Sequence, residues 1–366
     1  MPGFQFGFNR WIAINTGTAF GFGTWGTADS AFNVTSGPWA PTIERKSDLD
    51  EYTGYEEDSS SGTSRIIAMS IGGQISGRAT PHIIAVLGAA ALGSWSSATA
   101  GTLGTLATAY RHRIRPLKVA LGTLGAGNLP FLTVSESLSG TSDFQFDYQS
   151  AAVTSFSIST KRKDWIQFTA ELLGNGVRRT SSVAKPAVLS ETYLKAGDVR
   201  IYFGTAIAAT LGTQSKATSV DITGTAYGTT PDVTARVIDF NWSINNNLAA
   251  DDGYGMDSGT TRDHLDRGPR TQSLKITLEL NNSAQWTMLE SAKVLALELE
   301  CYNTLIESNA YYGFNLGFPK LSVKTAAVAG GPRDKMTIAY DFDVLEDTTK
   351  GSVMLDVYNT RVAYAI

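Results

Sequence analysis

TQSLKITLELNNSAQWTMLESAKVLAL, residues Thr271–Leu297, is the stretch in which the hydrophobic period changes from that of a strand to that of a helix. In Leu274–Leu280 apolar residues alternate with polar ones, as in a half-buried β-strand. From Trp286 to Leu297 the apolar residues recur at helical spacing, and Asn282 or Ser283 is a suitable N-cap. The stretch therefore predicts a strand, a tight polar turn and a short amphipathic helix.

The same arrangement occurs earlier in the chain. Sliding the sequence back by about 203 residues places Ile71–Gly77 on Leu274–Leu280. Thr80 is then the predicted N-cap of a helix, with Pro81 at its first position, where the missing N–H costs nothing. Both stretches have strand, turn, cap and helix in the same order, so the sequence predicts a duplicated domain.

Length and composition fit this prediction. The chain has 366 residues, which is long for one hydrophobic core and suits two domains of ordinary size. Its 36 glycines and its many Thr, Ser, Val and Tyr residues favour strands and turns over helices. Val177–Ala187 is the best linker in the sequence. We therefore expect a mainly β chain with two domains, at residues 1–180 and 181–366.

Charge and residue usage argue against several kinds of function. A net charge of −4 disfavours a nucleic-acid site that works by neutralising phosphates. The single cysteine, Cys301, excludes an intramolecular disulfide and a cysteine-rich metal site. His82, His112 and His264 are scattered, and neither a G-x-S-x-G elbow nor a P-loop occurs. The sequence therefore predicts no enzyme and no cofactor.

Two glycine-containing segments resemble ligand motifs only in part. Gly21–Gly26, GFGTWG, fits the dinucleotide fingerprint in its glycines, but the residues that follow make a poor helix. Asp251–Asp257, DDGYGMD, lacks the alternating oxygen ligands and the distal Glu of a calcium loop. We predict a flexible turn at the first segment and no metal site at the second.

No secretion signal or membrane span is visible in the sequence. Residues Met1–Asn15 lack a basic region followed by an apolar core. The most apolar run, His82–Leu92, is too short to cross a bilayer. We therefore expect a chain that is made and folded in a cytoplasm and has no membrane partner.

Two long acidic loops follow equivalent predicted strands, Trp39–Arg45 and Val237–Ile244. Ser47–Gly62 and Asn246–Gly268 are both too long for hairpin turns, and such loops are either functional or disordered. They are either solvated acidic loops or a surface for self-assembly. The candidate self-assembly residues are Asp48, Glu51, Tyr52, Tyr55, Glu56, Asp252, Tyr254, Met256, Asp263 and Arg267.

Three stretches carry a resemblance to a known family. They are Ile71–Gly93, the strand pair Val153–Ser159 and Trp165–Gly174, and Phe240–Leu248 before its long loop. Over most of its length the chain resembles the two-domain tail tube proteins of phages with long, non-contractile tails. The resemblance implies two tandem β-sandwich or partial-barrel domains, each flanked by one short helix.

The resemblance also implies an assembly. A chain with two copies of the domain would form homotrimeric, pseudo-hexameric rings whose inner strands close a β-barrel, which removes exposed strand edges. Rings would stack into a tube that conducts DNA from capsid to host without binding it specifically. The long loops would contact neighbouring rings. Partners would be the tape measure protein, the tail terminator and distal tail proteins, in a virion tail assembled in the host cytoplasm.

Other classes share this composition. A capsid decoration or tail terminator protein would form closed rings or trimers but no open-ended tubes. An outer-membrane barrel is also rich in glycine and alternating strands, but the missing signal peptide and the two predicted amphipathic helices argue against it. A carbohydrate-binding β-sandwich would need exposed aromatic side chains on one face, for which Trp25, Trp39 and Trp95 are the candidates.

Overall fold

A computed structural model of the chain describes residues 11–15, 25, 30–32, 40–47, 64–93, 95–96, 108–116, 129–137, 145–181, 191–204, 206–207, 222–223, 237–249, 254, 259–265, 267–280, 294–308, 310–330 and 334–362. Over these residues the protein is mostly β-strand, which confirms the predicted fold class. They also form an α-helix, α1 (Pro81–Leu92), and a short 3-10 turn, η3 (Ala196–Asp198).

The strands divide into a first half, β1 to β10, and a second half, β11 to β19. The first half consists of β1 (Trp11–Ile14), β2 (Ser30–Phe32), β3 (Ala40–Ser47), β4 (Ser64–Arg78), β5 (Trp95–Ser96), β6 (Tyr110–Ile114), β7 (Leu132–Ser137), β8 (Gln145–Lys161), β9 (Gln167–Gly174) and β10 (Arg178–Thr180). The second half consists of β11 (Val199–Gly204), β12 (Ala206–Ile207), β13 (Ile222–Thr223), β14 (Val237–Asn245), β15 (Thr271–Glu279), β16 (Leu295–Glu307), β17 (Ala310–Ala329), β18 (Thr337–Val344) and β19 (Met354–Asn359).

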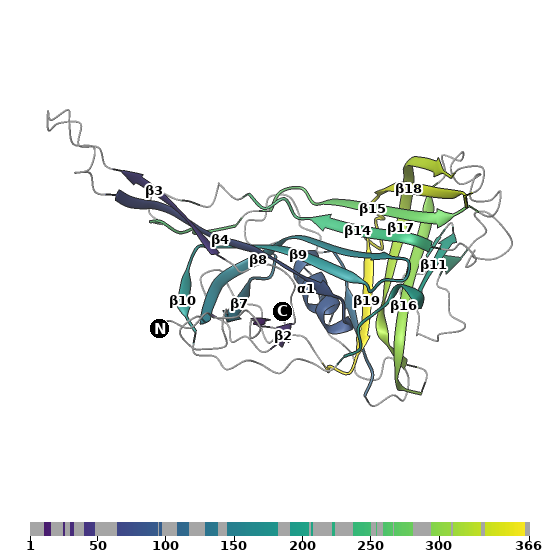
Figure 1. The fold of residues 1–366 in the computed structure, drawn as a ribbon, viewed down its shortest axis with the longest axis horizontal. Coiled ribbons are helices and arrows are strands. Elements are labelled where there is room, and N and C mark those ends of the chain that lie inside the picture. The colour runs from purple at the N-terminus through teal and green to yellow at the C-terminus, as the bar shows by residue number, and fades with distance from the viewer. Residues whose placement is uncertain are drawn as a thin grey trace.

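One antiparallel ladder runs through both halves in the order β3-β4-β9-β8-β14-β15-β18-β17. It curls into a half-barrel. β14 and β15 run across β16, β17 and β19, which form a second layer (Figure 1). Alternate residues of the curled ladder, such as Phe240, Trp242 and Ile244 of β14, are buried, because successive side chains of a strand point to opposite faces.

The order of strand pairing is the same in the two halves. In the first half β3, β4, β9, β8, β7 and β1 pair in sequence, and β10 adds to β8. In the second half β14, β15, β18, β17, β16 and β11 pair in the same sequence, and β19 adds to β17. Seven strands of each half therefore correspond. Among the described strands, β2, β5 and β6 of the first half and β12 and β13 of the second lie outside this correspondence.

Irregularities of the ladders also recur. β8 shifts register against β9 between Val153 and Ser155, and β17 shifts against β18 between Val323 and Thr325. These matching bulges align the halves residue by residue and make Gln74 the counterpart of Lys275. The sequence alignment placed Gln74 on Thr277. The two alignments differ by two residues. Because side chains alternate between the faces of a strand, both alignments place the same side chains toward the core.

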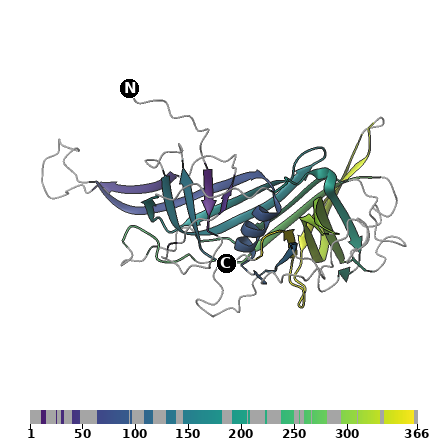
Figure 2. The same cartoon turned by 90° about the horizontal axis from the view of Figure 1, so that it is seen from below.

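Helix α1 begins and ends as the sequence predicts. The Thr80 hydroxyl accepts a hydrogen bond from the Ile83 amide at 3.4 Å, and Gly93 ends the helix with a φ of 79°. The expected amphipathic character is wrong, because every residue of α1 is buried. The helix packs against β8 and β19, near the middle of the molecule (Figure 2). At Gly88 a Cβ would lie 2.7 Å from Leu355 Cδ2, so a larger residue there would make the Leu355 side chain on β19 move.

The second predicted helix is wrong at its carboxyl end. Leu295–Leu297 belong to β16, between β11 and β17. In this segment Leu295, Leu297 and Leu299 alternate with other residues, and pairing on both sides fixes them as a strand. The rest of that prediction, residues 281–293, lies outside the described residues.

Candidate assembly surface

One face of the curled ladder has a hollow of about 650 Å³ that is lined mostly by polar residues. β8, β9, β14, β15, β17 and β18 all contribute residues to it, among them Ser159, Asn241, Thr277, Thr325 and Asp341. These residues alternate along their strands with the buried apolar ones. The ladder therefore separates the hydrophobic core from a polar, hollow face.

Opposite charges on this face are paired. Lys275 Nζ lies 3.4 Å from Asp341 Oδ2, and these residues are also opposite each other on β15 and β18. Lys324 Nζ lies 3.7 Å from Asp343 Oδ1. Because three of these four side chains are more than half exposed, the pairs contribute little to stability. Their effect is to keep the local charge of the hollow face close to balance.

The two halves of the ladder meet where β8 pairs with β14, a contact that we call the internal seam. Ile158 lies opposite Trp242. The backbone N–H of Asn246 donates to the Thr154 carbonyl at 2.8 Å. Residues that lie an even number of places from Thr154 on β8 therefore point their backbone polar groups across the seam.

Large side chains fill the core side of the internal seam. The Trp242 ring meets the Phe156 ring edge to face, with 6.1 Å between centroids, and meets the Phe318 ring at 6.2 Å. Trp242, Phe156 and Ile158 are fully buried in the core that the two halves share. The seam is thus built like the interior of a domain.

The two ends of the curled ladder carry open edges. Among the described strands, β3 pairs with β4 alone, and the Ser322–Ala329 part of β17 pairs only with β18. Val328, at this edge of β17, is 37% exposed. Pro41 on β3 has no N–H, which is acceptable at an edge position. Open edges of this length are sites at which another strand can add.

We call the loop between β14 and β15, residues 246–270, the second loop; its described residues contact the first half. The Tyr254 hydroxyl donates to the Met69 carbonyl at 2.9 Å, and the Met69 amide donates to the Thr260 carbonyl at 2.6 Å. Arg262 Nη1 donates to the Gly174 carbonyl at 2.9 Å. The Arg262 guanidinium also lies 4.9 Å from the centre of the Tyr254 ring. The second loop is therefore bound to β4 and to the end of β9.

The predicted self-assembly residues divide by what the structure describes. Asp48, Glu51, Tyr52, Tyr55, Glu56, Asp252 and Met256 lie outside the described residues. Tyr254 contacts β4 as stated above, Asp263 is exposed and hydrogen-bonds His264, and Arg267 pairs with Leu248. Arg262 is not among the predicted residues, although it donates to the Gly174 carbonyl. Its signal was a repeat, because Gly259–Arg262 (GTTR) matches 62–65 (GTSR).

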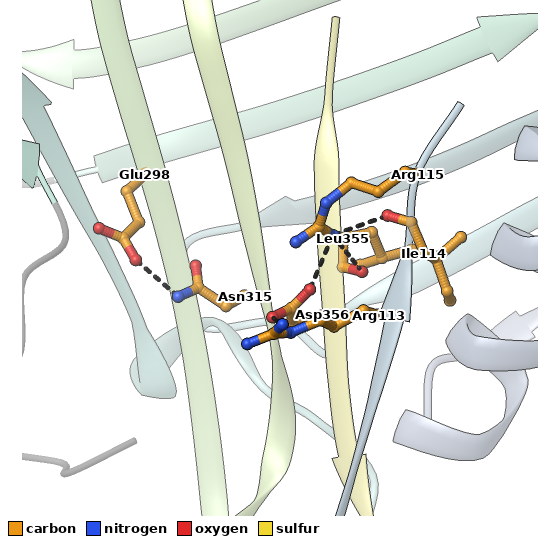
Figure 3. Close-up of polar contacts among 7 residues, drawn as sticks. All are labelled: Arg113, Ile114, Arg115, Glu298, Asn315, Leu355 and Asp356. Carbon is orange, nitrogen blue, oxygen red and sulfur yellow. Dashed lines mark hydrogen bonds and ion pairs between the residues drawn. The ribbon is translucent and has the colours of Figure 1, made fainter. Parts of the chain in front are cut away.

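A buried polar cluster ties the first half to the second layer (Figure 3). Arg115 Nη1, just after β6, lies 2.7 Å from Asp356 Oδ1 on β19, and Arg113 Nε lies 3.8 Å from Asp356 Oδ2. Burial raises the pKa of Asp356, although the neighbouring arginines oppose this. Next to it, Asn315 Nδ2 donates to Glu298 Oε1 at 2.6 Å. The sequence signal for this cluster was a charged residue within an otherwise apolar strand, which the motif search did not consider.

Two other kinds of site are absent from the described part of the chain. Within it, no group of three or more His, Cys, Asp or Glu side chains is placed to hold a metal ion. No helix among these residues is long and apolar enough to span a membrane.

Comparison with known proteins decides the family. The family model described as phage tail tube protein matches residues 17–344, which is most of the chain. The chain belongs to the phage tail tube family.

Membership gives this tail tube protein a structural role in the phage tail. It also implies assembly of the chain with copies of itself and with other tail proteins. The search of curated proteins found no match. Among solved structures, the SPP1 tail tube, studied by solid-state NMR and cryo-EM, is 13% identical, with 46% of this chain and 80% of that chain covered and a TM-score of 0.26.

Proposed function

We propose that the chain forms homotrimeric rings with pseudo-sixfold symmetry, and that these rings stack into the tube through which DNA passes from capsid to host cell. Residues 1–180 and 181–366 are then two copies of one tail tube domain. The repeated order of strand pairing, with its matching bulges, supports this division. Three chains of two copies give six equivalent positions around the ring.

The main support for the proposal is the internal seam. It shows how one copy of the domain joins the next within a single chain. Within the chain the last curled strand of the first half, β8, pairs with the first curled strand of the second half, β14. Their counterparts, β17 and β3, have open edges. If β17 of one chain pairs with β3 of the next, every edge of the curled ladder is used and the ring closes.

The hollow face would line the lumen. Its Ser, Thr and Asn side chains and its paired charges present no basic track to the DNA backbone. DNA and the tape measure protein would pass over this face without a specific site. The tail terminator and distal tail proteins would bind the ends of the tube, and assembly would take place in the host cytoplasm. Candidate loop residues such as Asp48 and Asp263 would contact neighbouring rings.

The test is negative-stain electron microscopy of the purified protein at high concentration, with one variant that blocks the edge of β17. Ala326 is the counterpart of Phe156, so its N–H points toward the open edge. Ala326→Pro removes this donor and places a ring against any added strand, whereas the β18 side keeps its hydrogen bonds. Ala326→Ser keeps the N–H and serves as the matched control.

We expect tubes with threefold ring averages for the natural sequence and for Ala326→Ser, and unassembled protein for Ala326→Pro. A natural sequence that stays monomeric under all conditions contradicts the proposal. Tubes formed by Ala326→Pro as readily as by Ala326→Ser would contradict the use of this edge.

A further inference from the structure

β3 and the first part of β4 extend away from the body of the protein as an arm, residues 40–47 and 64–70 (Figure 1). In the second half, the segment between β14 and β15 is the second loop, which lies on the first half instead. The arm and the second loop therefore occupy equivalent places in the repeat, and only the second loop has a neighbouring half within the chain to lie on.

The second loop covers an apolar position of the first half. Leu265 is buried in a cluster with Leu129 and Phe131, directly before β7, and Phe131 is 7% exposed. β7 pairs with β8 as β16 pairs with β17, so Val294, directly before β16, is the counterpart of Phe131. Val294 is 42% exposed. The second half thus has an uncovered apolar side chain where the first half has a covered one.

The hydrogen bonds between the second loop and the end of β9 also have an equivalent place in the second half. Arg262 bonds the carbonyls of Gly174 and Asn175, at the end of β9, through its guanidinium and its backbone amide. The equivalent end of β18 is Val344 and Leu345, both of which are half-buried. Backbone carbonyls at this corner can accept the same kind of hydrogen bond from another chain.

The arm carries features that suit this surface. Ile66 on β4 is 38% exposed, so the arm offers an apolar side chain to a partner. The residues just before it, 62–65, have the sequence GTSR, and the second loop has GTTR at Gly259–Arg262. The sequence repeat and the strand repeat both match the arm with the second loop, in registers that differ by four residues.

We propose that the arm of one copy lies on the second half of a neighbouring copy of this chain. Ile66 then covers Val294, beside the corner of Val344 and Leu345, as the second loop covers the first half within one chain. This contact rests on the proposed ring and adds to it a second surface, separate from the paired edges of β17 and β3.

The experiment compares tube formation by sedimentation and electron microscopy for single and paired substitutions. Ile66→Asp and Val294→Asp each place a charge in the proposed contact, and we expect each to lower the sedimenting fraction at least tenfold. Combining Ile66→Asp with Val294→Lys is expected to restore assembly, because opposite charges then meet. Leu305→Asp, at a site that is 49% exposed on β16, is the matched control and should assemble normally.

Circular dichroism and thermal unfolding should be unchanged in all these variants, because the altered side chains are exposed in the single chain. Normal assembly of both Asp variants overturns the contact, as does equal loss of assembly in Leu305→Asp. If the natural sequence forms tubes, these outcomes contradict only the contact made by the arm and not the proposed ring. Failure of the natural sequence to assemble would instead contradict the proposed function.

Discussion

At the internal seam β8 presents Phe156 and Ile158 on the core side, whereas the equivalent positions of β17 are Ala326 and Val328. The first two side chains are fully buried, while Ala326 is half-buried and Val328 is 37% exposed. The backbone arrangement is the same in both places, including the bulge that precedes it. The seam and the open edge therefore differ in side-chain size and burial.

The difference has a physical reason. A contact made within one chain forms during folding and can use large apolar side chains as freely as any core. An edge that must wait for a second chain stays exposed to water, and large apolar groups on it would promote wrong pairing. Small residues on β17 and Pro41 on β3 reduce that hazard, at the cost of a weaker contact per strand.

The largest effect on stability is expected when a large side chain of the internal seam is removed. Trp242→Ala removes a buried ring that contacts Phe156 and Phe318, so the free energy of unfolding should fall by about 3–5 kcal/mol. Urea denaturation measures this. Asn241→Ala, on the hollow face of the same strand, should change stability by less than about 0.5 kcal/mol. A loss below about 1 kcal/mol for Trp242→Ala would mean that the seam is not part of the folded core.

A somewhat smaller effect is expected at the end of the seam. Asn246 is fully buried, and its Nδ2 donates to the carbonyls of Ala91 and Val153, both at 2.9 Å. Asn246→Leu leaves these carbonyls and Arg270 Nε without that partner, which should cost about 2–3 kcal/mol. The same change at exposed Asn241 is the control in urea denaturation. Equal stability of the two variants would contradict a role of Asn246 in joining α1 to the seam.

A contact outside the seam also joins the halves, and it should respond to pH. Glu191 Oε2 accepts a hydrogen bond from the His82 amide at the start of α1 at 2.7 Å, and burial raises the pKa of Glu191 to about 7. Its contribution to stability is therefore full below its ordinary pKa of 4.5 and is lost as the pH rises to about 7. Arg361, His82 and the Thr80 hydroxyl act on the same group.

Burial lowers the pKa of His82 to about 3 and that of His112 to about 4, so these groups destabilise the fold as the pH falls below 6.5. Glu191 opposes them over the same range. Glu191→Gln removes this opposition to the histidine contributions, so the free energy of unfolding should fall more steeply between pH 7 and pH 5. Parallel pH profiles of the variant and the natural sequence, measured by urea denaturation, would contradict this coupling.

The smallest effect is expected on the hollow face. Lys275→Gln breaks an exposed ion pair with Asp341, which should change the free energy of unfolding by less than about 1 kcal/mol. Asp341→Asn should behave in the same way. Thermal unfolding at low and high salt measures both. A loss above about 2 kcal/mol would show that this face contributes to the fold and cannot be varied freely for the passage of DNA.

The sequence predicted what depends on local pattern. Alternation was sufficient for β14 and β15, and the Thr80–Pro81 pair was sufficient for the start of α1. Long-range pairing was not predictable from period alone, because β8 and β14 are distant in the chain and many strands share their pattern. Leu295–Leu297 show the same limit, since pairing with β11 and β17 decided between strand and helix.

The candidate site was predictable to a similar extent. Composition and spacing indicated that the loop holding Tyr254 was too long for a simple turn. Its partner, the carbonyl of Met69, is a backbone group and leaves no trace in side-chain chemistry. The open edge of β17 could not be recognised either, because an edge is defined by which strands are absent beside it.

The central claim is that chains join through β17 and β3 in the register of the internal seam. Ser157 lies opposite Ser243 in the seam, and the matching positions are Ala327 of one chain and Ala40 of the next. Both are non-hydrogen-bonded pairs, whose spacing suits a disulfide. Cys301 is buried and burial raises its pKa, so it should not compete.

The decisive measurement is therefore a non-reducing gel of oxidised tubes that carry Ala40→Cys and Ala327→Cys, with Ser157→Cys and Ser243→Cys as the internal control. We predict covalent dimers and trimers for the first pair, with nothing larger than three chains, and monomers with an internal disulfide for the control. Tubes in which the control pair forms its disulfide while Ala40→Cys and Ala327→Cys stay unlinked would contradict the claim. A covalent series that continues beyond three chains would contradict the closed trimeric ring.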